Sequence, residues 1–209
     1  SPIVGSCPTS SSPRRDMKPT VPVRKRSLQR GMSAVELAIV LGIGATLAAT
    51  AGPDFSGFFA NVQLRAASNN LRSGLRLAQL EAVKRQSPVE LVLTGDAPTA
   101  ATVRPSVDGR NWVIRAPLPD GRFELIETST LARQTSRVRV EAERGVFAFD
   151  PFGRLRADSF GHAAPTREIH IELSDHESRG RPLRVVVRPA GATTSCDPNA
   201  AGNDPFACG

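Results

Sequence analysis

The stretch GMSAVELAIVL, residues 31–41, decides the fold, because it opens a nearly uncharged segment that contains one carboxylate. From Met32 to Gly52 there are 21 residues, and Glu36 is the only charged one among them. A helix of this length is about 30 Å long, which matches the hydrocarbon core of a bilayer. A charge inside such a segment is costly and usually marks function. We therefore expect Glu36 to have a specific partner.

A protease that cut between Gly31 and Met32 would supply that partner. The cut would create an α-amino group with a reference pKa of about 8, and Glu36 would become the fifth residue of the new chain. The new amine of one subunit could then pair with the Glu36 carboxylate of a neighbour. The arrangement indicates an assembly device.

Residues 30–53 resemble the class III signal of type IV pilins and type II secretion pseudopilins. In that signal a basic leader ends in glycine, and the mature chain has glutamate fifth and proline twenty-second, the places of Glu36 and Pro53 here. Met32 stands where phenylalanine is usual. The resemblance implies that a membrane prepilin peptidase cuts after Gly31 and methylates the amine of Met32. It also implies that Glu36 and Pro53 serve the assembly of a helical filament.

Two other interpretations of this segment remain open. Residues 37–48 could be the apolar centre of an ordinary secretory signal peptide, with Ala49-Thr50-Ala51 as its cleavage site. The segment could also be a simple membrane anchor with no role in assembly. The position of Glu36 favours the pilin interpretation over both.

The net charge of +7 is concentrated in the leader, residues 1–31, and is not evidence for nucleic-acid binding. The leader has a Ser-, Pro- and Arg-rich composition that cannot bury a core. A basic flank before an apolar span stays on the cytoplasmic side. Together with this orientation, the pilin resemblance implies a single-pass protein of the bacterial inner membrane whose C-terminal domain lies in the periplasm. The basic residues of the leader are Arg14, Arg15, Lys18, Arg24, Lys25, Arg26 and Arg30.

Residues 53–87 continue the helix with an amphipathic pattern. Apolar residues recur at helical spacing, and basic residues occupy the other faces, so this half is expected to lie against a folded domain. Gln86-Ser87-Pro88 ends the pattern. The apolar stripe comprises Phe55, Phe59, Val62, Leu71, Leu75, Ala78 and Ala82.

From Val89 onward the pattern changes to short strands, which predicts a periplasmic β domain over residues 88–191. Asp108-Gly109 and Asp120-Gly121 supply turns between neighbouring strands. The predicted fold class is α+β, a long N-terminal helix packed on antiparallel sheet. The predicted strands are 89–93, 112–116, 123–126, 137–140, 146–149, 168–173 and 183–187.

Two further stretches, residues 77–89 and 147–154, resemble the end of the helix and a mid-domain strand and turn of the FimT/GspH group. This resemblance implies a minor pilin or minor pseudopilin at or near the tip of a type IV pilus or a type II secretion pseudopilus. The implied partners are prepilin peptidase, other major and minor subunits through the helix, the inner membrane and secreted protein substrates. The sequence does not choose between pilus and secretion machinery.

The cysteines predict one disulfide. Cys7 lies in the leader, which leaves Cys196 and Cys208 in the C-terminal segment 192–209. In the oxidising periplasm this pair is expected to close a loop and to contribute roughly 3 kcal/mol.

No catalytic residues, cofactor or metal are expected. His162, His170 and His176 come late in the chain, and the spacing of His170, Asp175 and His176 matches no metal signature. We therefore expect a protein that is not an enzyme.

A basic run near the C-terminus carries an alternative function. Arg179, Arg181, Arg184 and Arg188 gather there, and DNA-binding minor pilins of natural transformation are similar in carrying a glycine-arginine motif. Such a loop could contact DNA phosphates. The other interpretations are a solvated turn whose arginines pair with neighbouring acids, and a contact to another protein.

Overall fold

The structure is a computed structural model that describes residues 33–130 and 137–208, with the side chains of residues 48–55 left outside the description. The described residues belong to two units, one ending at Ala45 and the other beginning at Thr46.

The first described element is one long helix, α1 (Ala34–Arg85), of 52 residues. It ends where Gln86 adopts a left-handed backbone with φ of 50°, and the Ser87 N–H donates back to the Ala82 carbonyl at 3.3 Å. Pro88, which cannot continue a helix, follows directly. The predicted helix over residues 32–87 therefore agrees with α1 to within two residues at each end.

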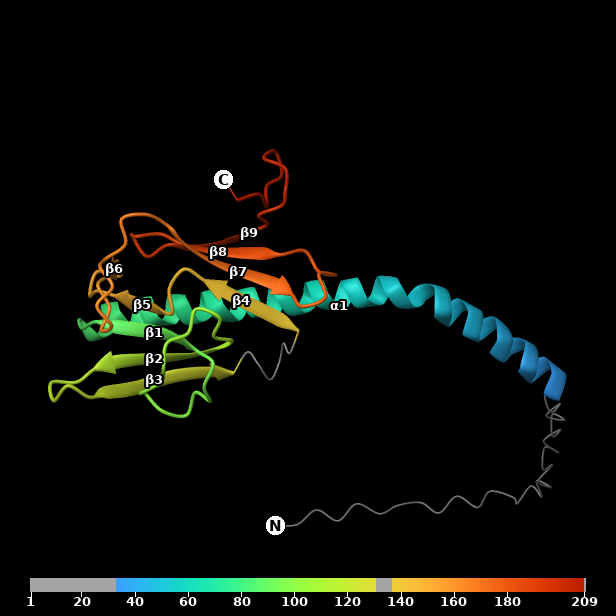
Figure 1. The fold of residues 1–209 in the computed structure, drawn as a ribbon, viewed down its shortest axis with the longest axis horizontal. Helices are drawn as coiled ribbons and strands as arrows, with labels where there is room; N and C mark the ends of the chain where they lie inside the picture. The colour runs from blue at the N-terminus through green and yellow to red at the C-terminus, as the bar shows by residue number, and fades with distance from the viewer. Residues whose placement is uncertain (1–32, 131–136, 209) are drawn as a thin grey trace, which may run out of the picture. The chain divides into compact units, whose positions relative to one another are not determined.

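The strands form two antiparallel sheets in the described residues, and Figure 1 shows both along the C-terminal part of α1. We call the strands and the part of α1 that they cover the β domain. The first sheet has the order β3-β2-β1-β5-β6 and the second β4-β7-β8-β9. The strands are β1 (Val89–Thr94), β2 (Asn111–Pro117), β3 (Phe123–Thr130), β4 (Val138–Ala142), β5 (Val146–Phe149), β6 (Leu155–Arg156), β7 (Ile169–Asp175), β8 (Leu183–Val187) and β9 (Thr193–Cys196).

The main core lies between α1 and the two sheets. One stripe of the helix is buried at spacings of three and four residues, and both sheets pack on it. This arrangement confirms the predicted α+β class. The buried alanine and leucine residues of α1 are Ala60, Leu64, Ala67, Leu71, Leu75, Ala78 and Ala82.

Phe59 and Val62 do not belong to this stripe, so their prediction as core-facing residues was wrong. They are 59% and 47% exposed, whereas Leu64 is fully buried. At 100° per residue, positions 59 and 62 lie on the side of the helix opposite positions 60 and 64. The sheets cover only the latter side at this level of α1.

All seven predicted strands are present, and β6 and β9 are additional. The Asp120-Gly121 turn connects β2 and β3, with φ of 80° at Gly121. Asp108-Gly109 lies in the long connection between the paired strands β1 and β2. The same connection contributes Val103 to a smaller apolar cluster with Val92, Val113 and Val146.

Candidate functional site

The predicted cleavage residues, Gly31 and Met32, lie outside the described residues, so cleavage and N-methylation stay predictions. Glu36 lies in the first turn of α1, where the Leu37 N–H donates to the Ser33 carbonyl at 3.0 Å. Its side chain is exposed. A carboxylate there interacts favourably with the positive end of the helix dipole.

The N-terminal part of α1 carries exposed aliphatic side chains around its circumference. Each is between 51% and 66% exposed. A large exposed apolar surface marks contact with a partner or a membrane. The side chains are those of Val35, Leu37, Ile39, Val40, Leu41, Ile43 and Leu47.

Within the residues that the structure describes, no helix has the length and apolarity to cross a bilayer. Part of the predicted span 32–52 lies outside the description. Met32 lies outside it entirely, and residues 48–52 lie outside it by their side chains. Pro53 falls within α1, and its side chain is likewise outside the description.

The loop between β7 and β8, residues 176–182, is fixed to α1. The Arg181 backbone N–H donates to Asn61 Oδ1 at 2.8 Å. A Cβ placed at Gly180 would come within 2.6 Å of Leu64 Cδ1, so a side chain at this position would force the buried Leu64 to move. The buried Asp175 carboxylate also accepts the Arg179 N–H at 3.0 Å.

The four arginines of the predicted basic run do not form one cluster. Arg184 and Arg188 lie on the outer side of β8, where Arg184 pairs with Glu172 at 2.5 Å and Arg188 with Glu168 at 2.7 Å. Arg179 lies in the loop and pairs with Glu177 at 3.3 Å. These pairs support the interpretation of a solvated turn whose arginines pair with neighbouring acids, and they do not favour DNA binding.

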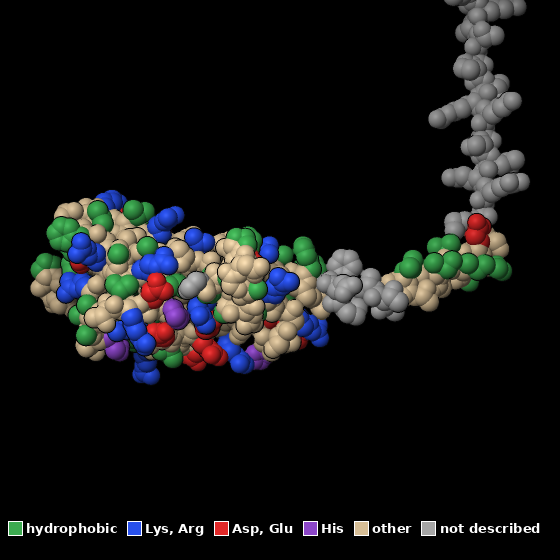
Figure 2. Space-filling view, turned by 90° about the horizontal axis from the view of Figure 1, so that it is seen from above, with side chains coloured by type: hydrophobic (Ala, Val, Ile, Leu, Met, Phe, Trp, Pro, Cys, Tyr) green, Lys and Arg blue, Asp and Glu red, His purple; other side chains and the backbone are tan. Residues whose placement is uncertain are grey.

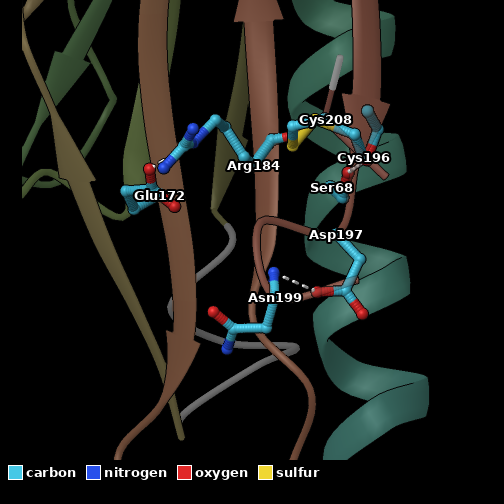
Figure 3. Close-up of a disulfide and its surroundings, with 8 residues drawn as sticks. Ser68, Glu172, Arg184, Cys196, Asp197, Asn199 and Cys208 are labelled. Carbon is cyan, nitrogen blue, oxygen red and sulfur yellow. Dashed lines mark hydrogen bonds and ion pairs between the residues drawn. A yellow bond between two sulfur atoms is a disulfide. The ribbon is translucent and has the colours of Figure 1, made fainter. Parts of the chain in front are cut away.

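Cys196 and Cys208 are joined by a disulfide with a Cα–Cα distance of 5.0 Å (Figure 3). Cys196 is the last residue of β9. The returning chain pairs with the next residue, because the Asp197 N–H donates to the Phe206 carbonyl at 2.7 Å. Figure 3 shows the disulfide close to Arg184, on the same side of β8 as the Arg184–Glu172 ion pair. The C-terminal segment thus contains a strand, β9, in addition to the loop.

A buried ion pair that the sequence does not predict joins Glu90 of β1 and Arg115 of β2. Arg115 Nη2 lies 3.0 Å from Glu90 Oε2, and the two side chains are 2% and 6% exposed. Ser159 donates to the same carboxylate through its N–H at 2.7 Å and its hydroxyl at 2.8 Å. The Arg115 guanidinium stacks on Phe123 at 3.8 Å from the ring centroid. This cluster satisfies its own charges and ties the loop that contains Ser159 to the sheet.

The histidines lie in separate contacts. His162 contacts Asp158 at 2.8 Å, His170 contacts Glu143 at 3.6 Å, and His176 contacts Arg139 at 3.1 Å. Across residues 33–130 and 137–208, no group of three His, Cys, Asp or Glu side chains is placed to hold a metal ion.

The comparisons with known proteins give a family and a fold. Residues 67–191, more than half of the chain, match the family model described as type II transport protein GspH. The crystal structure of the type IV minor pilin FimU of Pseudomonas aeruginosa (strain PAO1) in space group P21 aligns with a TM-score of 0.50 and 16% identity, covering 70% of this chain and 98% of FimU. The solution structure of E. coli GspH aligns with a TM-score of 0.44 and 13% identity, covering 70% and 94%. None of the curated proteins matches significantly.

A long helix that is covered by antiparallel sheets toward its C-terminus and carries exposed aliphatic side chains toward its N-terminus defines a pilin-type subunit. The chain belongs to the GspH family of type II transport proteins. The family consists of structural pilin and pseudopilin subunits of pilus-like assemblies, which confirms the predicted relationship to the FimT/GspH group.

Proposed function

We propose that this protein is a minor pseudopilin or minor pilin with a structural role and no catalytic activity. It is inserted in the inner membrane through residues 32–52, with the β domain in the periplasm. Prepilin peptidase cleaves after Gly31 and methylates Met32. The processed chain assembles at or near the tip of a type II secretion pseudopilus or a type IV pilus, and it supports protein secretion or pilus biogenesis.

The contrast between the two parts of α1 carries this proposal. Leu64, Leu71 and Leu75 are fully buried by the sheets, whereas the aliphatic side chains between Val35 and Leu47 are at least half exposed. Covering each of these half-exposed side chains would contribute roughly 1 kcal/mol. Lipid can supply that cover before assembly, and the helices of neighbouring subunits can supply it in the filament.

Glu36 fixes how the helices of neighbouring subunits align along their length in the filament. Among packed helices its carboxylate would leave water, and a buried carboxylate needs a cationic partner. The amine that cleavage creates at Met32 of a neighbouring subunit is such a partner. Loss of one member of a buried pair costs about 3–5 kcal/mol, so subunits that lack the carboxylate should be excluded from the filament.

The test compares Glu36→Ala with Glu81→Ala in cells that carry the native assembly machinery. Glu81 is the other glutamate of α1 and lies within the β domain, so it controls for loss of a helix carboxylate. We expect Glu36→Ala to reduce the amount of protein in sheared filaments at least about tenfold, and Glu81→Ala to leave it unchanged. Normal incorporation of the Glu36→Ala protein would contradict the proposal.

The mass of the intact protein purified from membranes tests processing. We expect a chain that begins at Met32 and carries one added methyl group. A chain that begins after Ala51 would instead identify an ordinary secretory signal peptide, and it would overturn the proposed anchor and assembly helix together.

A further inference from the structure

Three large apolar side chains are exposed on adjacent turns of α1 at the edge of the β domain. Phe58, Phe59 and Val62 are 64%, 59% and 47% exposed. The rings of Phe58 and Phe59 meet edge to face, with their centroids 5.9 Å apart. One exposed apolar side chain is ordinary, but three neighbours on one side of a helix indicate a contact surface.

The loop between β7 and β8 brings arginines to the same level of α1. The carbonyl oxygen of Arg179 would lie 3.5 Å from a Cβ at Gly57, and the Arg181 N–H donates to Asn61. Both arginine backbones therefore run beside the helical turn that carries the phenylalanines. We call the set Phe58, Phe59, Val62, Arg179 and Arg181 the collar.

At the collar, three of the exposed charged side chains are basic and one is acidic. Arg137 and Arg179 share a single partner, Glu177, at 3.5 and 3.3 Å, and the side chain of Arg179 is 52% exposed. Arg181 is exposed. The other carboxyl groups nearby are the buried Asp175 and, in sequence, Asp54.

This excess is local to the collar. Elsewhere in the same hairpin Arg184 and Arg188 each have a glutamate of their own. Figure 2 shows hydrophobic and basic side chains side by side at the end of the β domain from which α1 extends toward its N-terminus. The collar is therefore complementary to a surface that combines apolar and anionic groups.

The spacing along α1 indicates which surface this is. The proposed membrane segment ends at Gly52, and Phe58 follows six residues later, about 9 Å along the helix axis. The headgroup layer of a bilayer extends about 5–8 Å beyond the hydrocarbon core. Arginine side chains can reach several ångströms back toward it. Phenylalanine together with basic residues is typical of helices that bind at a membrane interface.

We infer that the collar binds the headgroups of anionic phospholipids while the subunit resides in the membrane. The inference rests on the proposed function, because it requires residues 32–52 to lie in the bilayer. The phenylalanines lie at the outer edge of the headgroup layer, and Arg179 and Arg181 contact lipid phosphates. These contacts hold the β domain at the membrane surface, and they are given up when the subunit enters the filament.

The experiment uses the full chain in nanodiscs of phosphatidylcholine alone or of phosphatidylcholine mixed equally with phosphatidylglycerol. Backbone hydrogen exchange is followed by mass spectrometry in peptides that cover residues 57–64 and 176–182. In the anionic discs we expect exchange in both peptides to be slower by at least about fivefold, and added salt to reduce the effect.

Two double variants separate the collar from general positive charge. Arg179→Gln with Arg181→Gln keeps both backbone N–H contacts and should abolish the difference between the two lipids. Arg184→Gln with Arg188→Gln removes the same charge from the same hairpin and should preserve the difference. The fluorescence of Trp112, the single tryptophan, reports whether each variant is folded.

The outcomes are distinct. Equal exchange in both lipids, or equal loss of the effect in the two double variants, would overturn the collar while leaving the proposed function intact. Protection that depends on neighbouring subunits and not on lipid would assign the phenylalanines to filament packing, and it would also overturn the collar. A chain that does not insert into the discs at all would contradict the proposed function.

Discussion

The indole of Trp112 lies against the backbone of Gly74, where α1 and β2 meet. Its N–H donates to Asn70 Oδ1 at 2.8 Å, one helical turn earlier. A Cβ at position 74 would come within 2.8 Å of Trp112 Cζ2 and within 3.1 Å of Leu91 Cδ1. The glycine therefore sets how closely the first sheet approaches the helix.

Gly74→Ala should destabilise the protein, although alanine is the better helix former. Helix propensity favours alanine by about 1 kcal/mol, but the rigid ring must move, and overpacking costs about 1–3 kcal/mol. We expect a net loss of up to about 2 kcal/mol in urea unfolding of the full chain in detergent, followed by Trp112 fluorescence. Gly57→Ala is the control, because its Cβ would meet only Arg179 O at 3.5 Å, and it should be neutral or stabilising. Stabilisation by Gly74→Ala would contradict this packing.

Arg115→Met should be among the most destabilising substitutions in the first sheet. It leaves the Glu90 carboxylate buried with only Ser159 as a hydrogen-bond donor. Loss of one member of a buried pair costs about 3–5 kcal/mol. The double variant Glu90→Leu with Arg115→Met should recover much of this loss, since neither charge then remains buried. Additive losses in urea unfolding would contradict the coupling.

Arg122→Gln is the matched control for that experiment. Arg122 pairs with Asp120 at 2.7 Å in the turn between β2 and β3, but the two side chains are 81% and 46% exposed. Exposed pairs contribute about 0–1 kcal/mol. Arg122→Gln should therefore change the free energy of unfolding by less than about 1 kcal/mol.

The sequence predicts those strands whose apolar residues define their own limits. The runs at Val146–Phe149 and Leu183–Val187 are predicted with the bounds that β5 and β8 have in the structure. By contrast, β9 has the sequence TTSC and is a strand because it pairs with β8. A polar edge strand of this kind is specified by its neighbour and has no pattern of its own.

Charge partners depend on register, which the sequence does not supply. Glu172 faces Arg184 across β7 and β8, and Glu90 faces Arg115 across β1 and β2. In the sequence alone, the run that contains Arg184 is a concentration of positive charge. Pairing with carboxylates from the adjacent strand neutralises most of it. The collar was missed for a similar reason, because its two parts are far apart in sequence.

The end of α1 should show a specific pH dependence through Glu81. Hydrogen bonds from Arg85 and then Lys84 lower the pKa of Glu81 below its ordinary value of 4.5. A lowered folded-state pKa contributes stability that is present above the unfolded pKa and is lost as pH falls through the folded value. Glu81→Gln should therefore reduce stability near neutral pH by up to about 1 kcal/mol, and this difference from the parent should vanish in acid. A difference that does not change with pH would contradict the ion-pair origin.

The disulfide should stabilise the protein mainly through the unfolded chain. Cys196 and Cys208 are 12 residues apart, and closure of a loop of this size contributes roughly 3 kcal/mol. Replacing both cysteines by serine should lower the free energy of unfolding by about that amount, with Trp112 fluorescence still reporting a native core. Reductant should lower the stability of the parent to that of the variant and should leave the variant unchanged. A parent that loses no stability on complete reduction would show that the contacts of residues 197–208, such as the hydrogen bond from the Asp197 N–H to the Phe206 carbonyl, already constrain this loop without the covalent bond.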